Sequence, residues 1–155
     1  PLGRLLVAAT RHGICMVSLG DSDSALEGAL KREYPRAQIR RDPKTLGPWL
    51  RSVLFQVQGK VPSRQLPVDV QATAFQRRVW QELLAIPRGS TRTYSQIARA
   101  VGKPRAVRAV ARACATNPAA IVVPCHRVIR SDGGLGGYRW GLPRKKALLA
   151  AENTL

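Results

Sequence analysis

The residues with the clearest chemical potential are Cys125 and His126, which stand side by side after an apolar run. The run Ala119-Ala120-Ile121-Val122-Val123 is typical of a buried strand, which would carry the polar cluster Pro124-Cys125-His126-Arg127 at its end. A cysteine in apolar surroundings keeps its proton and stays inert unless a nearby base or positive charge favours the thiolate. His126 is the candidate base, so the pair indicates nucleophilic chemistry.

An extended backbone at this pair has two consequences. Adjacent side chains on a strand point to opposite faces, so Cys125 and His126 need a bridging water to exchange a proton. A third group is then needed to orient the imidazole. The alternative is that Cys125 is a buried structural cysteine with no reaction of its own.

The elements after residue 70 must position this pair. A capping-box pattern begins a helix at Thr73, and Pro87 ends it. A second helix is expected over residues 95–101, and Pro104 is expected in the first turn of a third. The short connection at 102–104, which contains Gly102, predicts a helix-turn-helix.

The third predicted helix has one basic and one apolar face. Arg105, Arg108 and Arg112 at i, i+3 and i+7 share an outward stripe. The inward face would carry Val107, Val110, Ala111 and Cys114. A solvated surface is the alternative for such a stripe taken alone. The net charge of +17, with twenty arginines among 26 basic residues, favours a polyanionic partner, and with the helix-turn-helix it favours DNA.

Residues 1–70 predict a smaller unit without visible chemistry. The elements expected there are strands at 4–9 and 14–19, helices at 24–34 and 46–57, and short strands around 38–40 and 66–70. The chain is therefore predicted to be an α/β (α+β) protein. A small mixed α/β domain at 1–70 precedes a mainly helical domain at 71–155, which contains the helix-turn-helix and the cysteine.

Several classes of protein are excluded by composition. No apolar stretch is long enough for a membrane span and no signal peptide is visible, so we place the protein inside the cell, in the bacterial cytoplasm or the eukaryotic nucleus. The three cysteines form no disulfide framework, and His12 with Cys15 gives only two potential metal ligands, so we expect no metal. The chain opens at Pro1 without an initiator Met, which leaves further domains before it an open question.

The string Ile121-Val122-Val123-Pro124-Cys125-His126-Arg127-Val128-Ile129 resembles the signature of the O6-alkylguanine-DNA alkyltransferases, also called methylated-DNA-protein-cysteine methyltransferases. Further matches keep the family's order: Thr73 to Trp80, Thr93-Tyr94-Ser95-Gln96, Arg105 to Val110, Asn117-Pro118, Gly137-Tyr138-Arg139-Trp140-Gly141 and Leu148 to Glu152. The looser region around Gly13-Ile14-Cys15 resembles the C-terminal domain of the adaptive-response (Ada) members. The specific matches thus cover residues 73 to 152.

The resemblance implies a set of catalytic roles. Cys125 would accept the alkyl group, His126 would deprotonate it through a water, and Glu152 would orient His126. Asn117 would brace the turn around the site. Tyr94 would press on a phosphate and donate a hydrogen bond to the extruded guanine.

The resemblance also implies how DNA and substrate are held. Arg108 would fill the gap left in the base stack, with Arg105 and Arg112 on the same DNA-binding helix in the minor groove. The substrate-binding positions would be Val128, Tyr138, Arg139, Trp140 and Cys114, with the Trp140 indole near the alkyl group and restricting its size. Double-stranded DNA containing O6-alkylguanine is the expected partner of a monomer that uses no cofactor.

The activity so implied is DNA repair by irreversible, single-turnover transfer of an alkyl group from O6 of guanine, or O4 of thymine, to the protein's own cysteine, with nucleotide flipping. Two alternatives come from other classes. A helix-turn-helix regulator with a structural Cys125 would bind one short DNA sequence preferentially. A cysteine hydrolase or acyltransferase would turn over an ester or amide, and the arginine stripe would then be unexplained.

Overall fold

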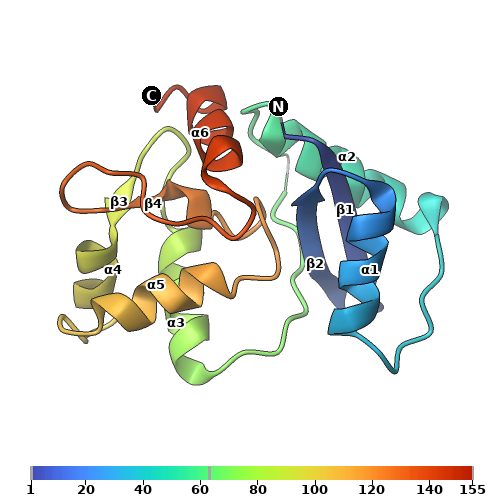
Figure 1. Ribbon diagram of the computed structural model, residues 1–155, viewed down its shortest axis with the longest axis horizontal. Coiled ribbons are helices and arrows are strands. Elements are labelled where there is room, and N and C mark those ends of the chain that lie inside the picture. The colour runs from blue at the N-terminus through green and yellow to red at the C-terminus, as the bar shows by residue number, and fades with distance from the viewer. Residues whose placement is uncertain (1, 63, 155) are drawn as a thin grey trace. The chain divides into compact units, whose positions relative to one another are not determined.

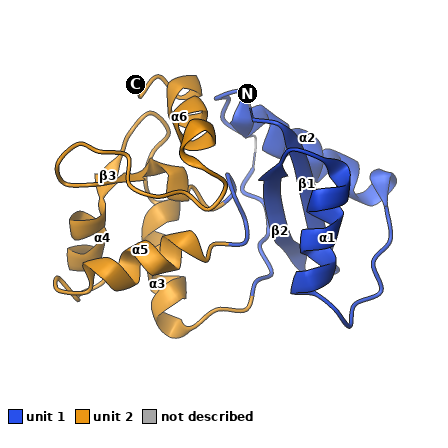
Figure 2. Ribbon diagram, in the orientation of Figure 1, with its two compact units in different colours: residues 1–70, 118–122 blue, residues 71–117, 123–155 orange. Residues whose placement is uncertain are grey.

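The chain folds into two compact units. The computed structural model describes residues 2–62 and 64–154. Unit 1 comprises residues 1–70 and 118–122, and unit 2 comprises residues 71–117 and 123–155 (Figure 2). Unit 1 combines strands with helices and unit 2 is mainly helical, so the predicted α+β class is confirmed. Within the described ranges, no helix is both long and apolar enough to cross a membrane.

Unit 1 is built on a hairpin. Strands β1 (Arg4–Thr10) and β2 (Gly13–Gly20) pair antiparallel, with an irregularity between Ala8 and Ala9. The backbone of Pro67 lies so close to Gly13 that only glycine fits there: a Cβ at this position would lie 2.9 Å from the carbonyl carbon and oxygen of Pro67. Nearly all of β2 is buried, so this strand forms the centre of the unit's apolar core.

Two helices cover the hairpin (Figure 1). Helix α1 (Asp23–Glu33) is capped by Ser22 and packs on both strands, and helix α2 (Pro43–Val57) begins with proline after the Asp42 cap and packs on β1. The predicted helices are therefore present, although α2 begins three residues earlier than its apolar pattern indicated.

The two short strands predicted in unit 1 are wrong. Residues 38–40 are exposed and irregular, because their single apolar side chain, Ile39, stays 43% exposed and gives too little burial to hold a strand. Residues 66–70 contribute only an isolated parallel bridge between Val68 and Ile14, for which Ile14 N donates to Pro67 O and Asp69 N donates to Ile14 O. A single bridge does not make this segment a strand of the sheet.

Unit 2 begins with helix α3 (Ala74–Leu84), whose start follows the predicted capping box. Thr73 Oγ1 accepts from Gln76 N at 3.1 Å, and the Gln76 side chain accepts from Thr73 N at 2.9 Å. The helix buries Val79, Trp80 and Leu83. Trp80 Nε1 donates to Ala113 O at 3.0 Å, so α3 is tied to the helix that follows the turn.

The helix-turn-helix consists of α4 (Tyr94–Ala100) and α5 (Val107–Ala115), which pack together. Gly102 adopts a φ of 77° after α4, a conformation that glycine takes without strain. The prediction that Pro104 lies in the first turn of α5 is wrong. Ala106 N donates to Lys103 O, so residues 103–106 form a separate turn, and Arg105 precedes the helix that carries Arg108 and Arg112.

The buried strand predicted at 119–123 is also absent. Ala119 forms only an isolated bridge with Val17, and the chain then turns, with Val122 N donating to Ala120 O and Ile121 at a φ of 72°. All five residues are nevertheless buried. The continuous apolar run therefore predicted the burial of these residues correctly and their backbone conformation wrongly. A turn can also be buried when its polar groups are paired.

The segment after this turn holds the cysteine. Cys125–Arg127 form a 3-10 turn (η1), followed by β4 (Val128–Ile129), which pairs in parallel with β3 (Arg92–Thr93). Helix α6 (Leu142–Ala151) then packs against η1. The predicted extended backbone at Cys125 is therefore replaced by a tight turn braced by α6.

Candidate active site

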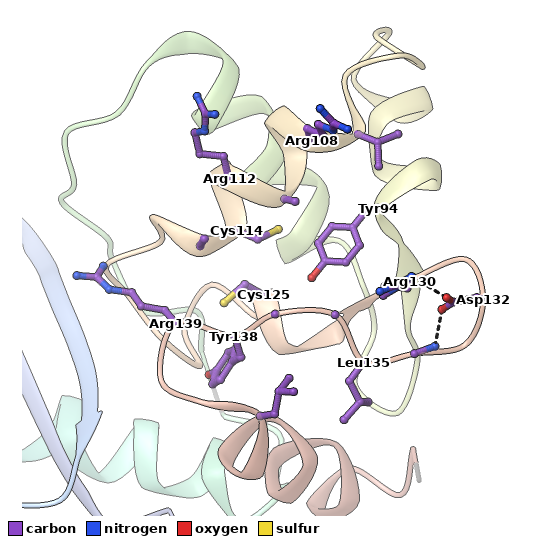
Figure 3. Close-up of a pocket in the computed structure, with 17 residues that line it drawn as sticks. Tyr94, Arg108, Arg112, Cys114, Cys125, Arg130, Asp132, Leu135, Tyr138 and Arg139 are labelled. Carbon is purple, nitrogen blue, oxygen red and sulfur yellow. Dashed lines mark hydrogen bonds and ion pairs between the residues drawn. The ribbon is translucent and has the colours of Figure 1, made fainter.

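One cavity of unit 2 gathers most of the residues singled out in the sequence. It is bounded by α5, by Tyr94 at the start of α4, by Cys125 and by the loop between β4 and α6 (Figure 3). The predicted site residues in its lining are Tyr94, Arg108, Arg112, Cys114, Cys125, Tyr138 and Arg139. Arg105 and Trp140 are not among the described residues that line it.

Cys125 lies at the base of this cavity and is 3% exposed. Its Sγ accepts a hydrogen bond from Asn117 Nδ2 at 3.3 Å, and the same amide donates to Val123 O at 2.9 Å. Asn117 thus joins both sides of the turn that presents the sulfur. Burial raises the pKa of the Cys125 thiol to about 11, although the Asn117 hydrogen bond and the charge of Lys145 act in the opposite direction. The sulfur is therefore a thiol at neutral pH, and its activation requires a base.

His126 and Glu152 form a buried pair behind the cysteine. His126 is 1% exposed, and its Nε2 lies 3.0 Å from Glu152 Oε1. Burial lowers the pKa of His126 despite the opposing hydrogen bond to Glu152, so the ring is neutral. A neutral ring that donates from Nε2 to the carboxylate leaves Nδ1 as an acceptor. No described residue bonds Nδ1, so this nitrogen keeps a lone pair that can accept a proton.

Arg127 is the third member of this buried group, and the sequence alone had suggested no role for it. Its Nε lies 2.9 Å from Glu152 Oε2 and its Nη2 lies 2.7 Å from Oε1, while Nη1 donates to Ile86 O. Burial acts to raise the pKa of Glu152, but the hydrogen bonds from His126 and Arg127 outweigh it and lower that pKa to about 2. Glu152 is therefore anionic and fixed by two neighbours. An arginine inside the signature was the available signal.

Tyr94 stands opposite Cys125 at the first position of α4. Thr93 caps this helix, and the tyrosine is 9% exposed. Burial and the two cavity cysteines raise the pKa of Tyr94 to about 12, so its hydroxyl remains a donor. Gly136, with a φ of 70°, packs against it: a Cβ there would lie 2.7 Å from Tyr94 Oη. The loop thus needs glycine at this point of contact.

The rest of the β4–α6 loop forms the cavity wall. Tyr138 packs edge-on against Trp140 with ring centroids 5.2 Å apart, and Arg139 Nη1 donates to Asn117 O at 3.2 Å. The Tyr138 hydroxyl is buried without a bond to any described residue. Trp140 is 8% exposed and is not among the described residues that line the cavity, whereas Tyr138, on which it packs, is.

The remaining site residues lie on α5 and β4. Arg108 and Arg112 are exposed at the cavity's outer part, and Cys114 is buried in the same wall with its pKa raised by burial to about 12. Val128 O accepts from Lys145 Nζ at 2.6 Å, and a carbonyl has a second lone pair for another donor. Within the described part of the chain, no cluster of three or more histidine, cysteine or acidic side chains could hold a metal ion.

Lys145 was also missed, although a periodic signal was present. Its side chain is completely buried on α6. Lys145, Leu148, Leu149 and Glu152 fall at i, i+3, i+4 and i+7, which is the spacing of one helix face. A lysine on such a face is ordinarily assigned to solvent, which conceals a buried one.

Comparison with known proteins gives one consistent result. The family model described as "6-O-methylguanine DNA methyltransferase, DNA binding domain" matches residues 74–154. The chain is 48% identical, over 97% of its length, to the bifunctional transcriptional activator/DNA repair enzyme Ada of Escherichia coli, of which it covers 43%. It therefore spans less than half the length of that relative.

Two other relatives are covered almost completely. The methylated-DNA--protein-cysteine methyltransferase of Methanosarcina barkeri is 41% identical over 99% of this chain and 93% of that protein. The crystal structure of Mycobacterium tuberculosis OGT in complex with DNA matches with a TM-score of 0.83 and 35% identity, over 99% of this chain and 88% of that one. This chain belongs to the O6-methylguanine DNA methyltransferase family.

Proposed function

We propose that the chain repairs DNA by moving an alkyl group from O6 of guanine, or O4 of thymine, onto Sγ of Cys125, once per molecule. The observation that carries the proposal is the buried Cys125 thiol beside a neutral histidine whose Nδ1 is unbonded among the described residues. Family membership supports the same reaction, as do relatives named for methyl transfer from DNA to a protein cysteine.

The first step is deprotonation of Cys125. His126 Nδ1 takes the thiol proton through a bridging water, and Glu152 stabilises the imidazolium that forms. Arg127 holds the carboxylate anionic, so the proton stays on the imidazole. Burial disfavours the thiolate in the resting protein, so Cys125 loses its proton to His126 only once the substrate is bound.

The second step is displacement at the alkyl carbon. The thiolate forms a C–S bond as the C–O6 bond breaks, and the electron pair of that bond passes to guanine. Tyr94 donates a hydrogen bond from its hydroxyl to the charge that develops on the base. The resulting thioether has no leaving group that the site can activate, so each molecule reacts once.

DNA must present the base outside the duplex for this geometry. An alkyl carbon in a stacked base is out of reach, so the nucleotide has to flip into the cavity. Arg108 on the outer part of α5 fills the vacated position in the stack, and Arg112 contacts the phosphate backbone beside it. A minor-groove approach would suit lesions at any sequence, because readout there is degenerate. The similarity to a protein solved with DNA supports double-stranded DNA as the partner.

Intact-mass measurement tests the proposal. The protein is incubated with a duplex oligonucleotide that contains one O6-methylguanine, and with the same duplex unmodified as the control. We expect a stoichiometric gain of one methyl group with the lesion, mapped to the peptide of Cys125, and no gain with the control. Absence of any gain with excess lesion would refute the proposed function.

A further inference from the structure

Lys145 is a buried charge that the mechanism above leaves without a role. Its side chain is completely buried, and it points into unit 2 with the apolar Leu148 and Leu149 of the same helix. An apolar side chain of similar length would pack there without the cost of removing an ammonium from water. A buried lysine at such a position therefore calls for a specific reason.

The ammonium is fully bonded to backbone. Lys145 Nζ donates to Val128 O at 2.6 Å, to Gly137 O at 3.1 Å and to Leu135 O. Three carbonyls use its three protons. Burial lowers the pKa of Lys145 to about 8, while Cys125 and Cys114 act in the opposite direction, so the amine is still mostly protonated at neutral pH.

These bonds converge on the cavity. Val128 follows directly after the Cys125 turn, and Leu135 and Gly137 flank Gly136, the glycine that packs against Tyr94 Oη. Lys145 Nζ also lies 5.8 Å from the centroid of the Tyr94 ring. Figure 3 shows the loop that carries Leu135 and Tyr138 running past Cys125 and Tyr94. One side chain thus connects the cysteine turn, the loop and the tyrosine.

We propose that Lys145 is a positioning residue for the transfer reaction, whose buried ammonium fastens the loop at 135–137 to Val128 and so fixes the cavity wall beside Cys125 and Tyr94. The inference rests on the proposed function. The ammonium acts through backbone carbonyls, and its charge also favours the Cys125 thiolate. Its loss would loosen the geometry in which the base and sulfur meet, and misplacement by about 1 Å typically costs up to about 100-fold in rate.

The test compares Lys145→Met with Lys146→Met. Methionine matches lysine in length and lacks its donors and charge, while Lys146 is the exposed neighbour on the same helix and loses the same charge. The measurements are the single-turnover rate at saturating methylated duplex, the Kd for that duplex, and peptide-resolved hydrogen exchange. For Lys145→Met we expect a rate at least about 10-fold lower, a Kd within about threefold, and faster exchange confined to residues 133–139. Lys146→Met should keep the wild-type rate.

Each outcome decides something different. A folded Lys145→Met protein with the wild-type rate overturns the inference, and so does a slower rate with exchange raised throughout unit 2, since that is general destabilisation. If the methionine variant does not fold, Lys145→Leu, which also lacks donors, replaces it, and a wild-type rate there has the same meaning. Failure of the wild-type protein to gain a methyl group overturns the proposed function itself, and it is seen before any variant is made.

Discussion

The two units bury different kinds of side chain. The described core of unit 1 is apolar, with Ser18 its one buried polar side chain, whereas unit 2 buries Asn117, His126, Lys145 and Glu152. Buried ionisable groups cost free energy unless they are paired, and those of unit 2 are paired around one cavity. The two units therefore differ in their interiors: that of unit 2 holds the polar groups of the candidate active site, and that of unit 1 is packed with apolar side chains.

The sharpest test of this contrast is substitution of a buried cysteine in each unit. Cys125→Ser should abolish methyl transfer while the Kd for duplex DNA stays within about threefold, because the exposed arginines of α5, which we propose to contact DNA, are untouched. Cys15→Ser, in the core of unit 1, should lower the melting temperature and leave transfer per folded molecule unchanged. Intact mass and fluorescence anisotropy measure both. A serine variant at 125 that still accumulates methyl groups would remove the cysteine from the reaction.

A smaller effect is expected from the carboxylate behind His126. Glu152→Gln removes the charge that stabilises the imidazolium and should slow single-turnover transfer by about 10- to 100-fold at neutral pH. Glu82→Gln is the matched control, since Glu82 is also paired with an arginine, Arg92, outside the cavity. Rapid-quench assays at saturating DNA give both rates. Equal rates for the two variants would show that the buried pair does not assist deprotonation.

The start of α3 and the candidate pair Cys125 and His126 could be predicted because both depend on local sequence. The capping box at Thr73 and the adjacent Cys125 and His126 are visible in a few consecutive residues. The conformation at Ile121 and the burial of Lys145 depend on contacts distant in sequence. Apolar periodicity records how much of a side chain is buried, and it leaves open both the backbone conformation and the burial of a lysine whose donors are all satisfied.

The contrast between the units extends to their arginines. Arg108→Ala should reduce repair of duplex substrate about 10-fold more than repair of the same lesion in single-stranded DNA, because only the duplex leaves a gap in the stack to be filled. Arg112→Ala, on the same helix, should reduce repair of both substrates equally, and Arg51→Ala in unit 1 should change the repair of neither. Single-turnover rates of the three variants on both substrates test these expectations. Equal losses on the two substrates for Arg108→Ala would assign it to phosphate binding alone.

The smallest effect is expected at Trp140 and concerns which alkyl groups the cavity admits. We predicted from the sequence that the indole lies next to the alkyl group. Trp140 is not among the described residues that line the cavity, and its ring packs edge-on on that of Tyr138, which does line it, with centroids 5.2 Å apart. Removing it would free Tyr138 to move aside for a benzyl ring, and an aromatic pair of this kind contributes about 0.5 to 1.5 kcal/mol.

Trp140→Ala should therefore raise the rate of reaction with O6-benzylguanine by about 2- to 12-fold, since that is the rate equivalent of the lost contact. Methyl transfer from DNA should change less, because a methyl group does not require Tyr138 to move. The two rates are measured on the same preparation, with Tyr138→Phe as a control that keeps the ring pair and removes only the buried hydroxyl. A gain near 100-fold would mean that the indole itself blocks the cavity. No gain in a folded, methyl-active variant would assign the limit on alkyl size to Tyr138 and the loop backbone.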